Sequence, residues 1–81
     1  MNDDTVEAAI LRLAEARGAG KSICPSEVAR ALDSEHWRSR LGAVKQGAVR
    51  LALAGKVEIL RKGKPVDPSD FKGVYRITIC A

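Results

Sequence analysis

The feature that most constrains this chain is a change of hydrophobic period at Gly55. Before Gly55, apolar residues recur at intervals of three and four, and after it β-branched residues dominate two short segments, 57–60 and 74–79. The stripe that precedes the change is formed by Trp37, Leu41, Val44, Ala48 and Leu51. This spacing keeps one side of a helix apolar, whereas the β-branched segments are typical of strands. We therefore predict a helix over 35–54, followed by a β-hairpin.

Two more helices are predicted upstream. The first begins at Asp4, a capping residue with Glu7 three positions later, and ends before Gly18. The second begins at Pro25, which fits the first helical position because proline has no N–H group to leave unpaired there. Between them, residues 22–23 are expected to form a stub of strand.

This order of elements corresponds to an α+β fold of the winged helix-turn-helix class. It has three helices, a C-terminal β-hairpin wing with a tight turn at Lys62 and Gly63, and a short strand after the first helix. A turn of about two residues at Asp33 and Ser34 would join the second and third helices into the helix-turn-helix pair. The length of 81 residues suits one domain, over residues 1–81.

The composition is that of a soluble globular domain, with 46% hydrophobic and 30% charged residues. No apolar run approaches the ~18 residues that a membrane span needs. Two cysteines, Cys24 and Cys80, have neither the spacing of a metal site nor that of a disulfide framework. We therefore expect a cytoplasmic protein with reduced thiols, no metal, no cofactor and no membrane partner. The sequence carries no enzyme motif.

The net charge of +4 is unevenly distributed. Residues 1–35 carry a net −3 and residues 65–81 a net zero, whereas residues 36–64 carry eight cations against Glu58, a net +7. Such a basic stretch is typical of a surface that binds a polyanion. In helix-turn-helix proteins the second helix of the pair enters the major groove, and the wing contacts the backbone or minor groove. The predicted partner is therefore double-stranded DNA, in a role such as transcriptional regulation.

The residues predicted to contact DNA come from the third helix and the wing. Arginine can read guanine and glutamine can read adenine, while lysines on an exposed tip mainly bind phosphates. The candidates are Arg38, Ser39, Gln46 and Arg50 from the helix, and Arg61, Lys62 and Lys64 from the wing.

A protein–protein interface is the alternative function. The exposed side of the third helix also holds a smooth apolar strip, formed by Gly42, Ala43, Val49 and Leu53. Such a strip suits self-association as a homodimer or contact with a protein partner.

Cys24 is a candidate reactive thiol. It precedes a helix start, where the helix dipole favours the thiolate. The competing interpretation is a capping residue or a small hydrophobic side chain. His36 is expected on the surface at a helix start. Trp37 is expected in the core rather than as a platform for stacked bases, and Phe71 or Tyr75 could cover the sheet.

One run of the sequence carries a family resemblance: Ile23-Cys24-Pro25-Ser26-Glu27-Val28-Ala29-Arg30, followed by Trp37-Arg38 and Gly63-Lys64-Pro65-Val66-Asp67-Pro68. With these motifs the chain resembles, over nearly its whole length, a family of small and mostly bacterial domains of unknown function placed among winged-helix proteins. The resemblance implies the fold but no activity. The chain departs from the family pattern at Gly73-Val74-Tyr75-Arg76, where the family tends to have Gly-Pro.

Overall fold

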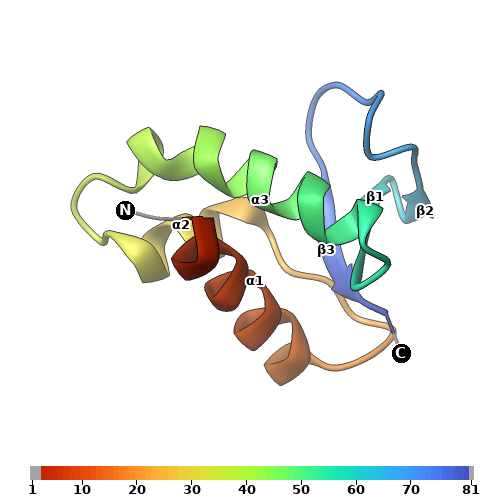
Figure 1. Ribbon diagram of the computed structural model, residues 1–81, viewed down its shortest axis with the longest axis horizontal. Helices are drawn as coiled ribbons and strands as arrows, with labels where there is room; N and C mark the ends of the chain where they lie inside the picture. Colours follow the sequence, from red (N-terminus) through yellow and green to blue (C-terminus); the bar gives the residue numbers. More distant parts are fainter. Residues whose placement is uncertain (1–2, 81) are drawn as a thin grey trace.

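The computed structural model describes residues 3–80, with side chains from Thr5 onward. The helices are α1 (Asp3–Arg17), α2 (Pro25–Leu32) and α3 (Leu41–Leu53), and a 3₁₀ turn, η1 (Trp37–Arg40), leads into α3. The strands β1 (Val57–Arg61), β2 (Lys64–Pro65) and β3 (Arg76–Ile79) form an antiparallel sheet in the order β2-β1-β3. Figure 1 shows the sheet and its loop beside one end of α3. The fold is α+β with a winged-helix-like arrangement, as predicted.

The tight turn of the wing lies at Lys62 and Gly63, as expected. Both residues have positive φ, 54° and 80°, which is the conformation of a type I′ hairpin turn. This turn joins β1 to the two-residue β2, after which residues 66–75 form a loop that returns to β3. The strand β1 is central, because it pairs with β2 on one side and with β3 on the other.

The predicted strand stub after α1 is a single β-bridge. Ile23 and Ile77 exchange backbone hydrogen bonds of 2.8 and 2.9 Å. Two side chains of β3 strengthen this connection. The Thr78 hydroxyl donates to the Lys21 carbonyl at 2.6 Å, and Arg76 Nε donates to Ser22 Oγ at 2.6 Å. The α1–α2 loop is thereby fixed to the edge of the sheet.

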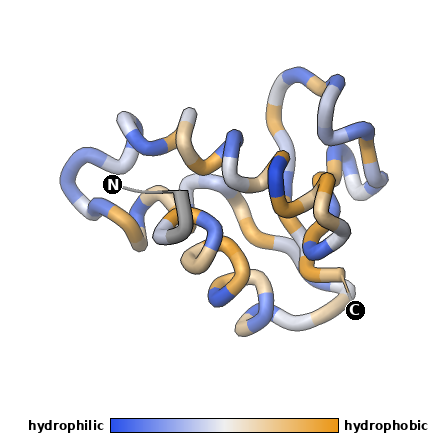
Figure 2. Tube along the Cα trace, in the orientation of Figure 1, coloured by the Kyte–Doolittle hydropathy of each residue, from blue (hydrophilic) through white to orange (hydrophobic). Residues whose placement is uncertain are grey.

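The core lies between the helices and one face of the sheet. On α3 the predicted stripe is buried at Val44, Ala48 and Leu51. Figure 2 shows where apolar residues occur along the helices and strands that surround this core. Gly47 of α3 packs closely against α1. A Cβ atom added there would be only 2.9 Å from Val6 Cγ1.

Gly55 ends α3 as its position predicts. It has φ of 79°, and the N–H groups of Gly55 and Lys56 donate to the carbonyls of Ala52 and Leu51 at 3.0 and 2.9 Å. These two bonds form a Schellman motif. The α1 helix likewise ends just before Gly18, but it already begins at Asp3. The capping role expected of Asp4 concerns a side chain outside the described residues.

The predicted two-residue turn between α2 and α3 is wrong. The connection spans residues 33–40, and the helix over 35–54 begins only at Trp37, as a 3₁₀ turn. Asp33 Oδ1 accepts the N–H groups of Glu35 and His36 at 3.2 and 3.0 Å, and the backbone at His36 (φ −119°, ψ 35°) leaves the helical region just before Trp37. These bonds hold the chain in a turn.

Two further predictions need correction. Trp37 is only half-buried, at the edge of the core, and the guanidinium groups of Arg30 and Arg38 lie 4.4 and 4.5 Å from its ring centroid. The last strand begins at Arg76 rather than Val74, whose side chain is 83% exposed. Within residues 3–80, no helix has the length and apolar character needed to span a membrane.

Candidate nucleic-acid interface

The exposed face of α3 is a shallow hollow with few charges. It is lined by Gly42, Lys45, Gln46, Val49 and Arg50. Gln46 is exposed, as a base-reading residue would need to be. Gly42 adds no side chain, so another molecule can approach the helix backbone closely at this point.

Arg50 has a structural partner that the sequence did not reveal. Its Nε donates to Glu7 Oε2 at 2.8 Å, and this ion pair joins α3 to α1. Both side chains are partly exposed, at 39% and 27%. Arg50 therefore serves at least partly to hold the two helices together.

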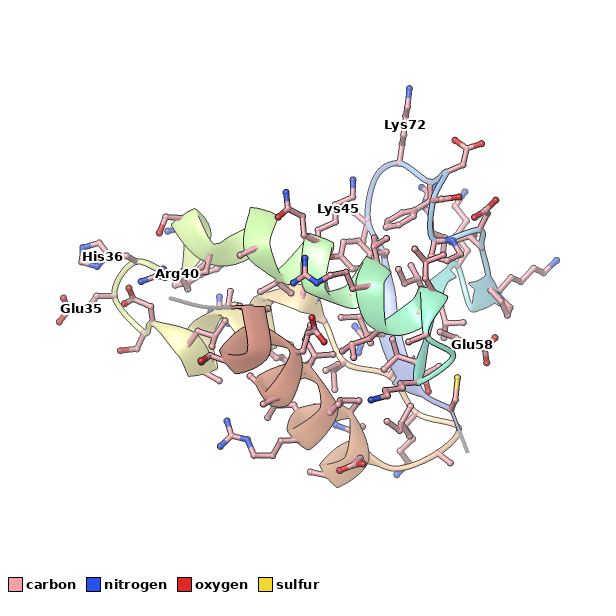
Figure 3. All side chains as sticks on the ribbon, in the orientation of Figure 1. Glu35, His36, Arg40, Lys45, Glu58 and Lys72 are labelled. Carbon is pink, nitrogen blue, oxygen red and sulfur yellow. The ribbon has the colours of Figure 1, made fainter. Side chains whose placement is uncertain are left out.

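Arg38 and Ser39 do not lie on α3, contrary to the prediction. Both belong to η1, before α3 begins. The Ser39 hydroxyl donates to the His36 carbonyl at 2.7 Å, and the Arg38 guanidinium lies over the Trp37 ring. Figure 3 shows this region, marked by His36 and Arg40, at the opposite end of the molecule from the wing. Arg38 is exposed and retains access to a partner, whereas Ser39 mainly stabilises the turn.

The wing presents two of its three predicted cations. Lys62 and Lys64 flank Gly63 at the hairpin turn and are exposed. Arg61 is half-buried and lies against the wing loop, where its Nε donates to the Val74 carbonyl at 3.0 Å. Its guanidinium covers Gly73, where an added Cβ would lie 2.9 Å from Arg61 Nη2. Arg61 therefore fastens the loop to β1.

Two lysines that were not among the predicted contacts join this surface. Lys45 lies on α3, and its ammonium is 5.0 Å from the ring centroid of Phe71 in the wing loop. Lys72 follows Phe71 at the tip of that loop and is exposed (Figure 3). Lys72 was missed because the charges of residues 65–81 sum to zero.

The net +7 of residues 36–64 overstates the charge available to a partner. Arg40 Nη2 lies 3.5 Å from Asp33 Oδ2, and Arg50 is paired with Glu7. Both carboxylates come from outside the basic stretch. By contrast, in the described part of the chain no carboxylate forms an ion pair with the exposed lysines of α3 and the wing. These lysines are Lys45, Lys62, Lys64 and Lys72.

The candidate thiol occupies the N-cap position of α2. The N–H group of Cys24 donates to Glu27 Oε2 at 2.7 Å, and its Sγ lies 3.1 Å from Ser26 Oγ. The pKa of Glu27 is lowered mainly by this bond from Cys24, and the adjacent Arg17 guanidinium lowers it further. Cys24 and Cys80 are both partly buried and unpaired. The position agrees with the capping interpretation, and the reactivity of Cys24 stays a prediction.

The apolar strip proposed as a protein interface is not continuous. Ala43 and Val49 are half-buried and pack on the core, whereas Gly42 is exposed and Leu53 is 66% exposed near the end of α3. His36 is exposed as expected, with Nδ1 at 3.7 Å from Asp33 Oδ2. Self-association through the strip stays a prediction.

Comparison with known proteins assigns a family without adding an activity. No curated protein matches the chain. Residues 3–80, which contain every helix and strand of the fold, match the family described as "Protein of unknown function (DUF3253)". This match bears out the resemblance to a family of unknown function, and the chain belongs to the DUF3253 family.

Proposed function

We propose that this protein binds double-stranded DNA and acts in gene regulation, with α3 and the wing directed toward the duplex. The observation that supports the proposal best is the set of exposed lysines on these two elements. Lys45 lies on α3 beside Phe71 of the wing loop, and Lys72 follows Phe71 in that loop. Lys62 and Lys64 flank the hairpin turn. In winged-helix proteins these elements contact the duplex.

The character of α3 suggests that phosphate contacts supply most of the affinity. Its open face offers Gln46 as the main base-reading side chain, beside Gly42 and Val49, which have no polar side-chain groups. Lysine contacts to phosphates position a protein on DNA but carry no sequence information directly. We therefore expect tight binding only at low salt and modest preference among sequences.

Fluorescence anisotropy with a labelled mixed-sequence duplex at low salt tests this proposal. We expect Lys62→Glu/Lys64→Glu to weaken binding by about tenfold or more, because each reversal removes a phosphate contact and adds repulsion. The matched control is Arg12→Glu/Lys21→Glu, which changes the net charge equally at exposed positions on α1 and its following loop. Equal losses in both variants would refute the interface, and no binding by the wild-type chain would refute the function.

We also infer that the DUF3253 family as a whole is of winged-helix type, because the match includes all helices and strands of this chain. A cytoplasmic location fits a DNA-binding protein with two unpaired cysteines. The bacterial origin expected from the resemblance stays a prediction.

A further inference from the structure

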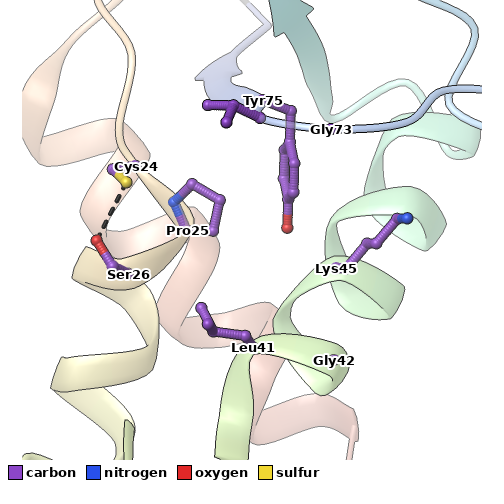
Figure 4. Close-up of a pocket in the computed structure, with 9 residues that line it drawn as sticks. Cys24, Pro25, Ser26, Leu41, Gly42, Lys45, Gly73 and Tyr75 are labelled. Carbon is purple, nitrogen blue, oxygen red and sulfur yellow. Dashed lines mark hydrogen bonds between the residues drawn. The ribbon is translucent and has the colours of Figure 1, made fainter. Parts of the chain in front are cut away.

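A groove next to the hollow on α3, which shares Gly42 and Lys45 with it, has the features of a small-molecule site. It lies between the start of α2, the first turns of α3 and the segment that leads into β3 (Figure 4), and its volume is about 580 Å³. Its lining residues are Cys24, Pro25, Ser26, Leu41, Gly42, Lys45, Gly73, Val74 and Tyr75. Volumes of this order are usual for sites that take small ligands.

The Tyr75 hydroxyl is the feature that points to a ligand. Tyr75 is only 8% exposed, and its hydroxyl has no hydrogen-bond partner among the described residues. Figure 4 shows the ring extending from the chain before β3 into the space between Pro25 and Lys45, with the hydroxyl at its far end. Buried hydroxyls in folded proteins normally have a partner. The Tyr75 hydroxyl therefore suits a group brought by another molecule.

This hydroxyl is a donor at neutral pH. Burial, and secondarily the electrostatic effect of the nearby Cys24, raise the pKa of Tyr75 to about 12. The phenol consequently keeps its proton at neutral pH and can donate a hydrogen bond to an acceptor.

The other lining groups restrict the chemistry of that acceptor. Lys45 brings a positive charge, and none of the nine lining residues is Asp or Glu. The hydroxyl of Ser26 and the thiol of Cys24 already interact with each other at 3.1 Å. Pro25, Leu41 and Val74 give the groove apolar walls. The site thus combines an apolar surface with two donors, one of which is cationic.

We propose that the groove binds a small carboxylate with an aromatic or branched apolar body. The Tyr75 hydroxyl donates to the carboxylate, the Lys45 ammonium pairs with it, and the apolar body packs against Pro25, Leu41 and Val74. Lys45 belongs both to this groove and to the proposed DNA-binding surface, but binding of a carboxylate in the groove requires no DNA, so the two proposals are tested separately.

Titration of the ¹⁵N-labelled protein with benzoate, followed by amide chemical shifts, tests the site. We expect saturable shifts concentrated at Gly42, Gly73 and Tyr75. Tyr75→Phe and Lys45→Met should each weaken benzoate by about tenfold, because each removes one bond to a charged group. The control Lys64→Met removes an exposed lysine outside the groove and should leave the affinity unchanged.

A blocking variant makes the test independent of Tyr75. Gly42→Leu should abolish the shifts while the fold persists, since an added Cβ at Gly42 meets no atom within 4 Å and the bulk enters the groove. Unsaturable shifts spread over the exposed lysines, or wild-type benzoate affinity in Tyr75→Phe or Gly42→Leu, would overturn the proposal. Equal affinity for benzyl alcohol, which has the same ring without the charge, would overturn the assignment to a carboxylate.

Discussion

Gly47→Ala is expected to destabilise the protein, although replacing glycine by alanine inside a helix usually has the opposite effect. A Cβ at position 47 would lie 2.9 Å from Val6 Cγ1 and 3.3 Å from Ile10 Cδ1. Val6 and Ile10 are fully buried, so neither side chain has room to withdraw. Helix propensity contributes about 1 kcal/mol in favour of alanine, whereas overpacking a core costs about 1–3 kcal/mol. We therefore expect a net loss of about 1 kcal/mol in the free energy of unfolding.

Gly42→Ala in the same helix is the matched control. An added Cβ at Gly42 meets no atom within 4 Å, so only the propensity gain of up to about 1 kcal/mol remains. Urea unfolding followed by the fluorescence of Trp37, the single tryptophan, measures both variants. The Gly47→Ala midpoint should fall and the Gly42→Ala midpoint should rise, with unchanged m-values. The close packing of α1 on α3 would be refuted if Gly47→Ala were stabilised as much as Gly42→Ala.

Two further predictions concern titration. Tyr75 is the only tyrosine, so the ultraviolet absorbance of its phenolate should titrate near pH 12 in the native protein and near 10 in denaturant. Because the pKa of Tyr75 is raised on folding, the contribution of its protonated phenol to the free energy of unfolding is complete below pH 10 and is lost as the pH rises through 12. A titration midpoint near pH 10 in the native protein would contradict the burial of Tyr75. The pKa of Glu27 is lowered from 4.5 on folding. The contribution of its carboxylate to the free energy of unfolding is therefore present above pH 4.5 and is lost as the pH falls through the lower pKa of the native protein. Glu27→Gln should therefore flatten the acid limb of stability measured by urea unfolding, and an unchanged limb would contradict the cap.

Much of the fold was predictable because its signals are local. Val44, Ala48 and Leu51 are buried at the spacing that the sequence predicts, and Gly55 closes α3 with a motif that needs its positive φ. The start of that helix was not predictable from spacing. Trp37 has the right interval to Leu41, but the backbone at His36, with φ of −119° and ψ of 35°, is not helical, and residues 37–40 form a 3₁₀ turn. The apolar stripe predicts which face of the helix is buried, but it does not determine the residue at which the helix begins.

The candidate interface was less predictable because it depends on contacts between distant parts of the chain. Arg50 is paired with Glu7, 43 positions away, and Arg61 donates to Val74, 13 positions away. A count of charges along the sequence treats both arginines as available to a partner. The unpaired hydroxyl of Tyr75 could not be predicted from the sequence for the same reason, because the groove around it is formed by three separate segments of the chain.

The salt dependence of duplex binding by the wild-type chain tests the DNA proposal most directly. Each phosphate contact contributes a slope of about −0.9 to the plot of log K against log salt concentration, so the four exposed lysines predict a slope of about −3.6. A slope near −7 would mean that all eight cations of residues 36–64 contact phosphate, contrary to the pairing of Arg40 and Arg50. A slope near zero, or no binding at low salt, would contradict the DNA-binding proposal itself.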